Sequence, residues 1–182
     1  MNPLSEILKK SLPIVLLIVL LIFNNASAFI FYNDIKYPVK IVLPASPTEF
    51  EKHAADVLQD YLFRITGCKP NIIDDTAPLG SSEIIIGNNK HLWYLKWNLD
   101  LSLIDKDGFL VSTRGNYLLI AGGAKRGIIY GVYAFLEKYC GCRKYSADCK
   151  VIPKRDTIVV RSEEHTSELQ SRFAIRMPSS AW

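Results

Sequence analysis

Apolar side chains recur at helical spacing after residue 48, and this periodicity is the clearest structural signal in the chain. They fall on one face of a helix of about five turns, at Phe50, Ala54, Val57, Leu58, Tyr61, Leu62 and Ile65. The preceding Ser46-Pro47-Thr48-Glu49 predicts a capping box with proline at the first helical position. Gly67 is expected to end the helix, because glycine readily adopts the left-handed conformation found just beyond helix ends.

A second apolar stripe predicts another helix, from about residue 125 to residue 139. Apolar, largely β-branched runs predict strands at 39–43, 70–73, 83–86, 109–113, 117–121 and 157–160. A Gly-containing connection at 114–116 makes two of these strands a hairpin, and a short helix is expected around 90–97. This order of elements predicts an α+β fold of two layers, in which two main helices pack on a mixed sheet.

Residues 1–28 have the three-part pattern of a secretory signal peptide. Lys9 and Lys10 precede an apolar run over 12–23, and small residues follow at Ala26 and Ala28. As a helix the run would be about 18 Å long, against about 30 Å for the hydrocarbon core of a bilayer. We therefore predict cleavage and export to the periplasm or the extracellular space, with a retained N-terminal membrane anchor as the alternative.

Residues 161–182 differ in character from the rest of the chain. Residues 161–171 resemble the translation of a sequencing-library adapter, and residues 172–182 show no clear period. A genuine amphipathic or disordered tail is the alternative. We treat the segment as an artefactual or disordered tail, and this places the folded domain at 29–160.

Charge and cysteine content narrow the function classes. The net charge of +4 is mild and gives no argument for nucleic acid. The four cysteines allow two disulfides in three connectivities, which stay open; they are Cys68, Cys140, Cys142 and Cys149. A metal site is the weaker alternative, because Cys140-Gly141-Cys142 lacks the two-residue gap of a zinc knuckle. No cofactor or metal is therefore expected.

Pairs of carboxylates are candidate catalytic groups, because glycoside hydrolysis uses two carboxyl groups about 5 to 10 Å apart. The candidates are Asp74 with Asp75, Asp105 with Asp107, and Glu137. The first four lie in or beside turn sequences, where solvated carboxylates are common. Glu137 falls on the polar side of the second helix. We therefore assign no catalytic residue.

Two other stretches invite a binding role. Gly122-Gly123-Ala124-Lys125-Arg126-Gly127 joins a strand to a helix, but it lacks the glycine spacing of phosphate-binding loops. Close packing of helix on sheet is the preferred interpretation there. Trp93 and Trp97, four residues apart, are weak candidates for stacking on a sugar ring. The alternatives are that they cover a sheet edge or face a neighbouring domain.

The body of the chain resembles a known domain. The residues that carry the resemblance are Leu62 to Gly67, Ile84 to Gly87, Asp107 to Phe109, Ile120 to Glu137, and Gly141 to Arg143. They are similar to the N-terminal α/β domain that precedes the catalytic barrel in α-glucuronidases and β-N-acetylhexosaminidases. Secreted bacterial α-glucuronidase-like proteins are the most similar group, and the resemblance covers all of 29–160.

This resemblance implies an accessory domain whose chemistry is performed by a following (β/α)₈ barrel. Such a barrel needs about 250 residues, which the residues after Val160 cannot supply. We therefore expect a non-catalytic domain of a secreted hydrolase of polysaccharide catabolism, inactive alone and truncated before its barrel. Its expected partners are that barrel and, as a further candidate, a polysaccharide. The alternatives are a stand-alone carbohydrate-binding module and a membrane-anchored structural domain.

Overall fold

The computed structural model describes residues 28–32, 39–123, 126–144 and 150–161. The predicted signal peptide up to residue 27 and the tail from residue 162 lie outside the described residues. The helices are α2 (Glu49–Thr66), α3 (Lys90–Tyr94) and α4 (Gly127–Lys138), with a 3₁₀ turn η1 (Leu101–Leu103). The strands are β1 (Ala28–Tyr32), β2 (Lys40–Leu43), β3 (Asn71–Asp74), β4 (Glu83–Ile86), β5 (Phe109–Arg114), β6 (Tyr117–Gly122), β7 (Arg143–Lys144), β8 (Lys150–Val151) and β9 (Thr157–Arg161).

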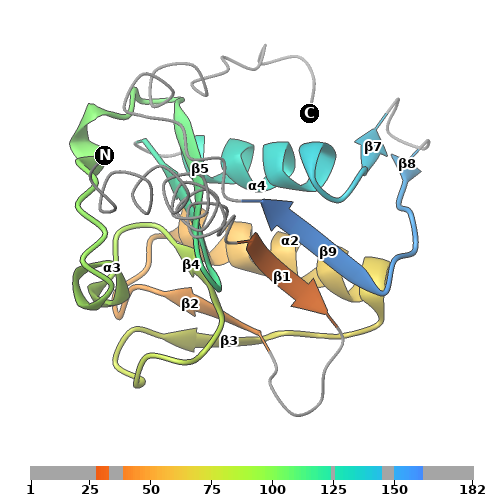
Figure 1. Cartoon of the computed structure of the whole chain (residues 1–182). Helices are drawn as coiled ribbons and strands as arrows, with labels where there is room; N and C mark the ends of the chain where they lie inside the picture. Colours follow the sequence, from red (N-terminus) through yellow and green to blue (C-terminus); the bar gives the residue numbers. More distant parts are fainter. Residues whose placement is uncertain (1–27, 33–38, 124–125, 145–149, 162–182) are drawn as a thin grey trace, which may run out of the picture.

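A mixed five-stranded sheet forms the centre of the domain, in the order β3-β2-β4-β6-β5 (Figure 1). The first four strands of that order are parallel, and β5 pairs antiparallel with β6. The β5–β6 hairpin turns through Gly115 and Asn116, and Gly115 has a φ of 57°. The predicted α+β fold of two layers, with two main helices packed on a mixed sheet, is confirmed.

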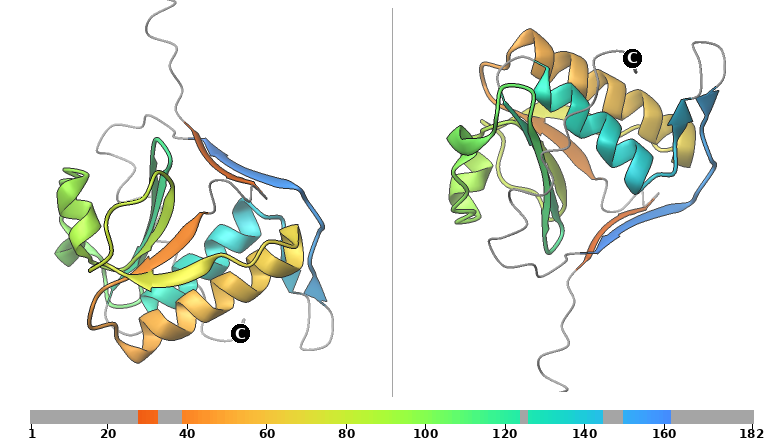
Figure 2. Two further views of the ribbon diagram at one scale, coloured as in Figure 1. Left: turned by 90° about the horizontal axis from the view of Figure 1, so that it is seen from below. Right: turned by 90° about the horizontal axis from the view of Figure 1, so that it is seen from above.

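The two long helices cover one face of the sheet, and α3 lies on the other (Figure 2). Strand β4 shows why both faces need cover, because all four of its residues are buried. Ile84 and Ile86 point into the large core beneath α2 and α4, whereas Ile85 points into a smaller cluster beneath α3. Parallel strands are typically buried on both faces in this way, with successive side chains pointing to opposite sides.

Helix α2 begins two residues later than the sequence pattern predicts. The N-cap is Thr48, whose hydroxyl accepts from the backbone N–H of Glu51 at 3.2 Å. The Glu51 carboxylate accepts in return from the Thr48 backbone N–H at 2.8 Å. A capping box is therefore present, but over Thr48–Glu51 and not over 46–49. The expected C-terminal stop is confirmed, since Gly67 has a φ of 77°.

A two-stranded ribbon of β1 and β9 closes the helical side of the core (Figure 1). Phe29 and Phe31 of β1 and Ile158 and Val160 of β9 are all buried there. The pattern predicts β9, but β1 was not expected, and neither were the short strands β7 and β8. Strand β1 follows directly on the predicted leader, and the sequence pattern assigned no element to residues 28–32.

Candidate functional site

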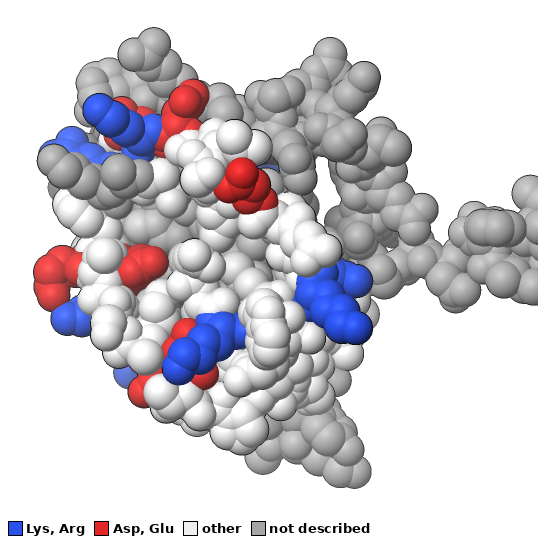
Figure 3. All heavy atoms as spheres, turned by 90° about the vertical axis from the view of Figure 1, so that its left-hand side faces the viewer, with Lys and Arg blue, Asp and Glu red and all other residues white. Residues whose placement is uncertain are grey.

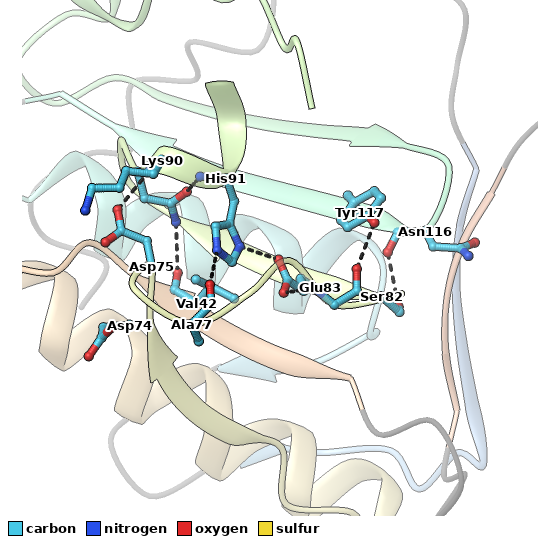
Figure 4. Close-up of polar contacts among 12 residues, drawn as sticks. Val42, Asp74, Asp75, Ala77, Ser82, Glu83, Lys90, His91, Asn116 and Tyr117 are labelled. Atoms are coloured by element: carbon cyan, nitrogen blue, oxygen red, sulfur yellow. Dashed lines mark hydrogen bonds and ion pairs between the residues drawn. The ribbon is translucent and has the colours of Figure 1, made fainter. Parts of the chain in front are cut away.

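A buried hydrogen-bonded cluster lies at the amino end of β4 (Figure 4). His91 of α3 places its Nδ1 2.7 Å from the Oε2 atom of Glu83, and neither side chain is exposed to solvent. The Nε2 atom of His91 lies 3.0 Å from the carbonyl oxygen of Ala77. Oε1 of Glu83 accepts the backbone N–H of Gly80 at 2.7 Å. The cluster therefore fastens the loop between β3 and β4 to α3.

Tyr117 completes this arrangement from the neighbouring strand β6. Its hydroxyl donates to the Gly80 carbonyl oxygen at 2.8 Å. Burial raises the pKa of Tyr117, and the negative charge of Glu83 raises it further. No path from solvent reaches the acid of this cluster, since Glu83 is fully buried. A general acid or base must contact its substrate. The burial of Glu83 and His91 therefore supports a structural role for this pair.

A second anchor lies at the carboxyl ends of the strands. The buried carboxylate of Asp75 accepts the backbone N–H groups of Ala45 and Lys90, both at 2.9 Å. Asn89 caps α3 by accepting from the His91 backbone N–H at 3.0 Å. These contacts join the segment after β2 to the first turn of α3 (Figure 4). The carboxylate is therefore fixed by backbone donors, as buried polar groups generally are.

A hollow of about 420 Å³ lies beside this anchor, at the carboxyl ends of the parallel strands. Its lining includes the first turn of α2, residues 87–88 after β4, residues 121–123, and Leu101, Ser102, Ile104 and Lys106. Ligands of open α/β sheets bind at such edges, so the hollow is a candidate ligand site. Among the described residues that line it, Glu51 is the one carboxylate and Lys106 the one cation. The Glu51 carboxylate already serves as the cap of α2, so the described part of the lining offers no carboxyl pair for glycoside hydrolysis.

The other candidate carboxylates lie in separate surroundings. Asp74 is exposed, and hydrogen bonds from the Thr76 side chain and backbone lower its pKa. Asp105 and Asp107 are exposed, and Glu137 accepts from Arg143 at 2.6 Å in a half-exposed ion pair. The structure therefore does not assemble these side chains into one site.

The glycine-rich junction after β6 shows close packing of backbone on backbone. A Cβ on Gly122 would lie 2.0 Å from the backbone nitrogen of Ile128, and one on Gly127 would lie 2.2 Å from the carbonyl oxygen of Gly108. Both contacts are too short for any side chain, so the glycines let α4 start directly against the sheet. This supports the packing interpretation, although Ala124 and Lys125 lie outside the described residues.

The two candidate tryptophans lie in different surroundings. The predicted helix at 90–97 ends at Tyr94, and Trp97 lies beyond it. Trp97 is partly buried against the cluster beneath α3, whereas 78% of Trp93 is exposed. The Trp93 ring meets the ring of Tyr94 edge-on, with centroids 5.3 Å apart. The face that includes α3 is uncharged at its centre and carries charged side chains around it (Figure 3).

The cysteines within the described residues are thiols. Cys68, Cys140 and Cys142 are free, and Cys149 lies outside. Burial raises the pKa of Cys140 to about 12, so this thiol stays protonated near neutral pH. Among the residues placed by the structure, no three His, Cys, Asp or Glu side chains gather as metal ligands. None of the described helices has the length and apolarity needed to cross a bilayer.

The residues that matter most for this arrangement, Glu83 and His91, were not among the predicted site residues. Glu83 opens a strand whose other three residues are isoleucines, and His91 follows the next turn. An acidic residue in an otherwise apolar, doubly buried strand is a signal that it needs a buried partner. Asp75 was considered only as a solvated turn residue, and in fact it is buried.

Two of the solved structures similar to this chain are glycoside hydrolases. One is a family GH115 4-O-methyl-α-glucuronidase with specificity for decorated arabinogalactans, at 20% identity and a TM-score of 0.51 over 71% of this chain and 17% of that one. Another is a GH20 exo-β-N-acetylglucosaminidase from Vibrio harveyi, at 15% identity and a TM-score of 0.43 over 75% of this chain and 16% of that one. This chain thus spans about a sixth of each. No curated protein matches it.

The fold is that of an α/β domain in which helices cover both faces of a largely parallel sheet. Residues 33–135 match the family described as Glycosyl hydrolase family 67 N-terminus. The chain belongs to this family. The resemblance to the N-terminal domain of α-glucuronidase-like enzymes is therefore confirmed.

Proposed function

We propose that this chain is the non-catalytic N-terminal domain of an exported carbohydrate-active hydrolase, whose parent protein is α-glucuronidase-like and acts in polysaccharide breakdown. The observation that carries the proposal is the family match over residues 33–135. This range includes all of the five-stranded sheet, helix α2 and most of helix α4. The contacts of three carboxylates support a non-catalytic role. Glu51, Asp75 and Glu83 each accept a hydrogen bond from a backbone N–H group and so hold the fold in place.

Enzyme assay tests the non-catalytic part of this proposal. The purified chain is incubated with an aryl α-glucuronide and an aryl N-acetylhexosaminide, with an intact α-glucuronidase as the positive control. We expect release of the aryl group at the rate of the blank. Turnover at ordinary enzyme rates, about 1 to 1,000 per second, would refute it.

The position of the domain in its parent is a separate part of the proposal. We expect a catalytic (β/α)₈ barrel to follow it, and the role of the domain to be bracing that barrel. Sequencing the genomic DNA downstream of the codon for Val160 tests this part. An uninterrupted reading frame that encodes a barrel supports it, and a stop codon directly after the present last residue contradicts it.

Export is tested by the mass of the mature protein. Cleavage after Ala28 gives a chain that begins at Phe29, the first buried residue of β1. A membrane-fraction protein that still carries residues 1–28 would instead favour the alternative of a membrane-anchored structural domain.

A carbohydrate contact at Trp93 is the second candidate function. Its ring is exposed, is held edge-on by Tyr94, and lies on the α3 side of the sheet. Aromatic faces of this kind stack on apolar ring surfaces. Glycan titration followed by calorimetry tests it, comparing wild type with Trp93→Ala and with Phe63→Ala, which removes an exposed ring from α2. Binding lost only in Trp93→Ala supports the contact; absence of binding in wild type sinks it.

A further inference from the structure

The hydrogen bonds around His91 fix where its protons lie. The Nε2 atom faces the Ala77 carbonyl oxygen at 3.0 Å. A carbonyl oxygen can only accept, so Nε2 must carry a hydrogen and donate it. Among the described residues, no buried side-chain nitrogen or oxygen lacks a partner. That contact is therefore one of the bonds that hold the loop after β3.

The other ring nitrogen sets a second requirement. Nδ1 lies 2.7 Å from Oε2 of Glu83, while Oε1 of the same carboxyl group accepts the Gly80 backbone N–H. An ionised carboxylate has no hydrogen, and a neutral imidazole protonated at Nε2 has a lone pair at Nδ1. Two lone pairs facing each other at this distance would repel. A second proton must therefore lie between the two atoms, on Nδ1 or on Oε2.

We propose that the folded domain traps one proton in the His91–Glu83 pair, and that this proton is what locks α3 to the loop before β4. In an unfolded chain above about pH 7, histidine is neutral and glutamate is ionised, so the two separate side chains hold one proton fewer than the folded pair. Folding therefore takes up a proton in that range. The anchor beneath the exposed Trp93 becomes dependent on pH.

Neighbouring groups do not supply the missing hydrogen. The elements packed against the pair contribute Lys40 from β2, Tyr117 from β6, Tyr94 and Lys90 from α3, and Asp75 from the loop. The Tyr117 hydroxyl donates to the Gly80 carbonyl oxygen, and the Asp75 carboxylate holds two backbone N–H groups. Neither is directed at the gap between Nδ1 and Oε2. The proton belongs to the pair itself.

The direction of the pH effect follows from proton counting. Above about pH 7 the unfolded state binds one proton fewer than the folded state, so stability falls as pH rises, by about tenfold in the unfolding constant per pH unit. Between about pH 4.5 and pH 6.5 the unfolded chain holds the same number of protons as the folded pair, because its charged histidine carries two and its ionised glutamate none. The pair then contributes no slope. The loss is confined to the alkaline side.

The variant Glu83→Gln removes the need for the extra proton. The amide NH₂ of the new side chain donates to the Nδ1 lone pair of neutral His91, and its carbonyl oxygen accepts the Gly80 N–H. Every contact of the cluster is then satisfied. Glu49→Gln is the matched control, since it makes the same change at a side chain that is 87% exposed.

The test is urea unfolding of the whole chain from pH 6 to pH 9. We expect wild type and Glu49→Gln to lose stability together above pH 7, about tenfold per pH unit in the unfolding constant relative to Glu83→Gln. Parallel curves for Glu83→Gln and wild type would overturn the proposal. It does not depend on the proposed function, so either can fail without the other.

A spectroscopic measurement on wild type decides the matter if the variant does not fold. In ¹⁵N-labelled protein at pH 8, the ring of His91 should show a protected hydrogen on Nε2. Nδ1 should be either protonated or hydrogen-bonded to a carboxylic acid. A neutral ring with its single proton on Nδ1 and a bare Nε2 would overturn the proposal.

Discussion

The two faces of the central sheet are stabilised in different ways. The helical face has a large apolar core, to which α2, α4, the sheet and the β1–β9 ribbon all contribute. On the opposite face, the described residues form a cluster of four buried side chains, covered by a five-residue helix, a 3₁₀ turn and connecting loops. Its cover is held at its ends by the buried polar groups Asp75, Glu83 and His91.

This difference shows how a largely parallel sheet can be covered on both faces with few residues. Long helices bury enough apolar area to stay in place by packing alone. A short, irregular segment cannot, so hydrogen bonds to fixed backbone groups position it instead. Apolar packing thus holds the long helices on one face, and buried hydrogen bonds position α3 and its loops on the other. The comparison predicts that truncating an apolar side chain should cost most under the helices.

The largest effect is expected for Leu58→Ala on α2. Leu58 is fully buried in the core between α2 and the sheet, and well-packed surroundings collapse poorly around a cavity. We expect a loss of about 4 kcal/mol in the free energy of unfolding, measured by urea denaturation. A loss below about 2 kcal/mol would mean that the helical face is not the rigid side of the domain.

Removal of a polar anchor should cost nearly as much on the opposite face. Asp75→Ala leaves the backbone N–H groups of Ala45 and Lys90 without their acceptor. We expect a loss of about 3 kcal/mol in the free energy of unfolding, because a charged acceptor for two bonds disappears. The matched control is Asp74→Ala, the exposed neighbour, with an expected change within about 0.5 kcal/mol. Equal effects of the two variants would contradict the anchoring role.

The same difference explains what the sequence could predict. Apolar residues recur at helical spacing in α2 and in α4, so buried residues such as Leu58 and Phe135 can be identified from the sequence. The hairpin of β5 and β6 and the stop at Gly67 follow from turn chemistry. These signals are local. They give the fold class correctly and most of the core beneath the helices.

The cover of the second face has no such period. Glu83 and His91 are eight residues apart, and Asp75 holds a backbone group thirty residues away in the sequence. Only the folded sheet brings these groups together, so no local pattern marks them. The two-residue shift of the α2 cap has a similar origin, since Ser46 and Thr48 are both plausible N-caps. The structure selects Thr48, whose partner Glu51 faces the sheet edge at Gly87.

A smaller effect is expected for Leu92→Ala, the counterpart of Leu58→Ala on the thin face. Leu92 is buried in the cluster of four, next to side chains that are only partly covered. These neighbours can close a cavity, and water can enter it. We expect a loss of about 2 kcal/mol in the free energy of unfolding, by the same denaturation measurement. A loss equal to that of Leu58→Ala would show that the two faces are equally well packed.

The smallest effect is expected for Trp93→Ala, on the outer side of the same cover. The ring is 78% exposed and its ring contact is with Tyr94, which is exposed as well. Truncation therefore removes little buried area, and the free energy of unfolding should change by no more than about 0.5 kcal/mol. Urea denaturation checks this, with Phe63→Ala on α2 as a second exposed ring for comparison. A loss above about 2 kcal/mol would mean that Trp93 helps to hold α3 on the sheet. Its ring would then serve the fold, and the case for a partner that binds this exposed ring would be weaker.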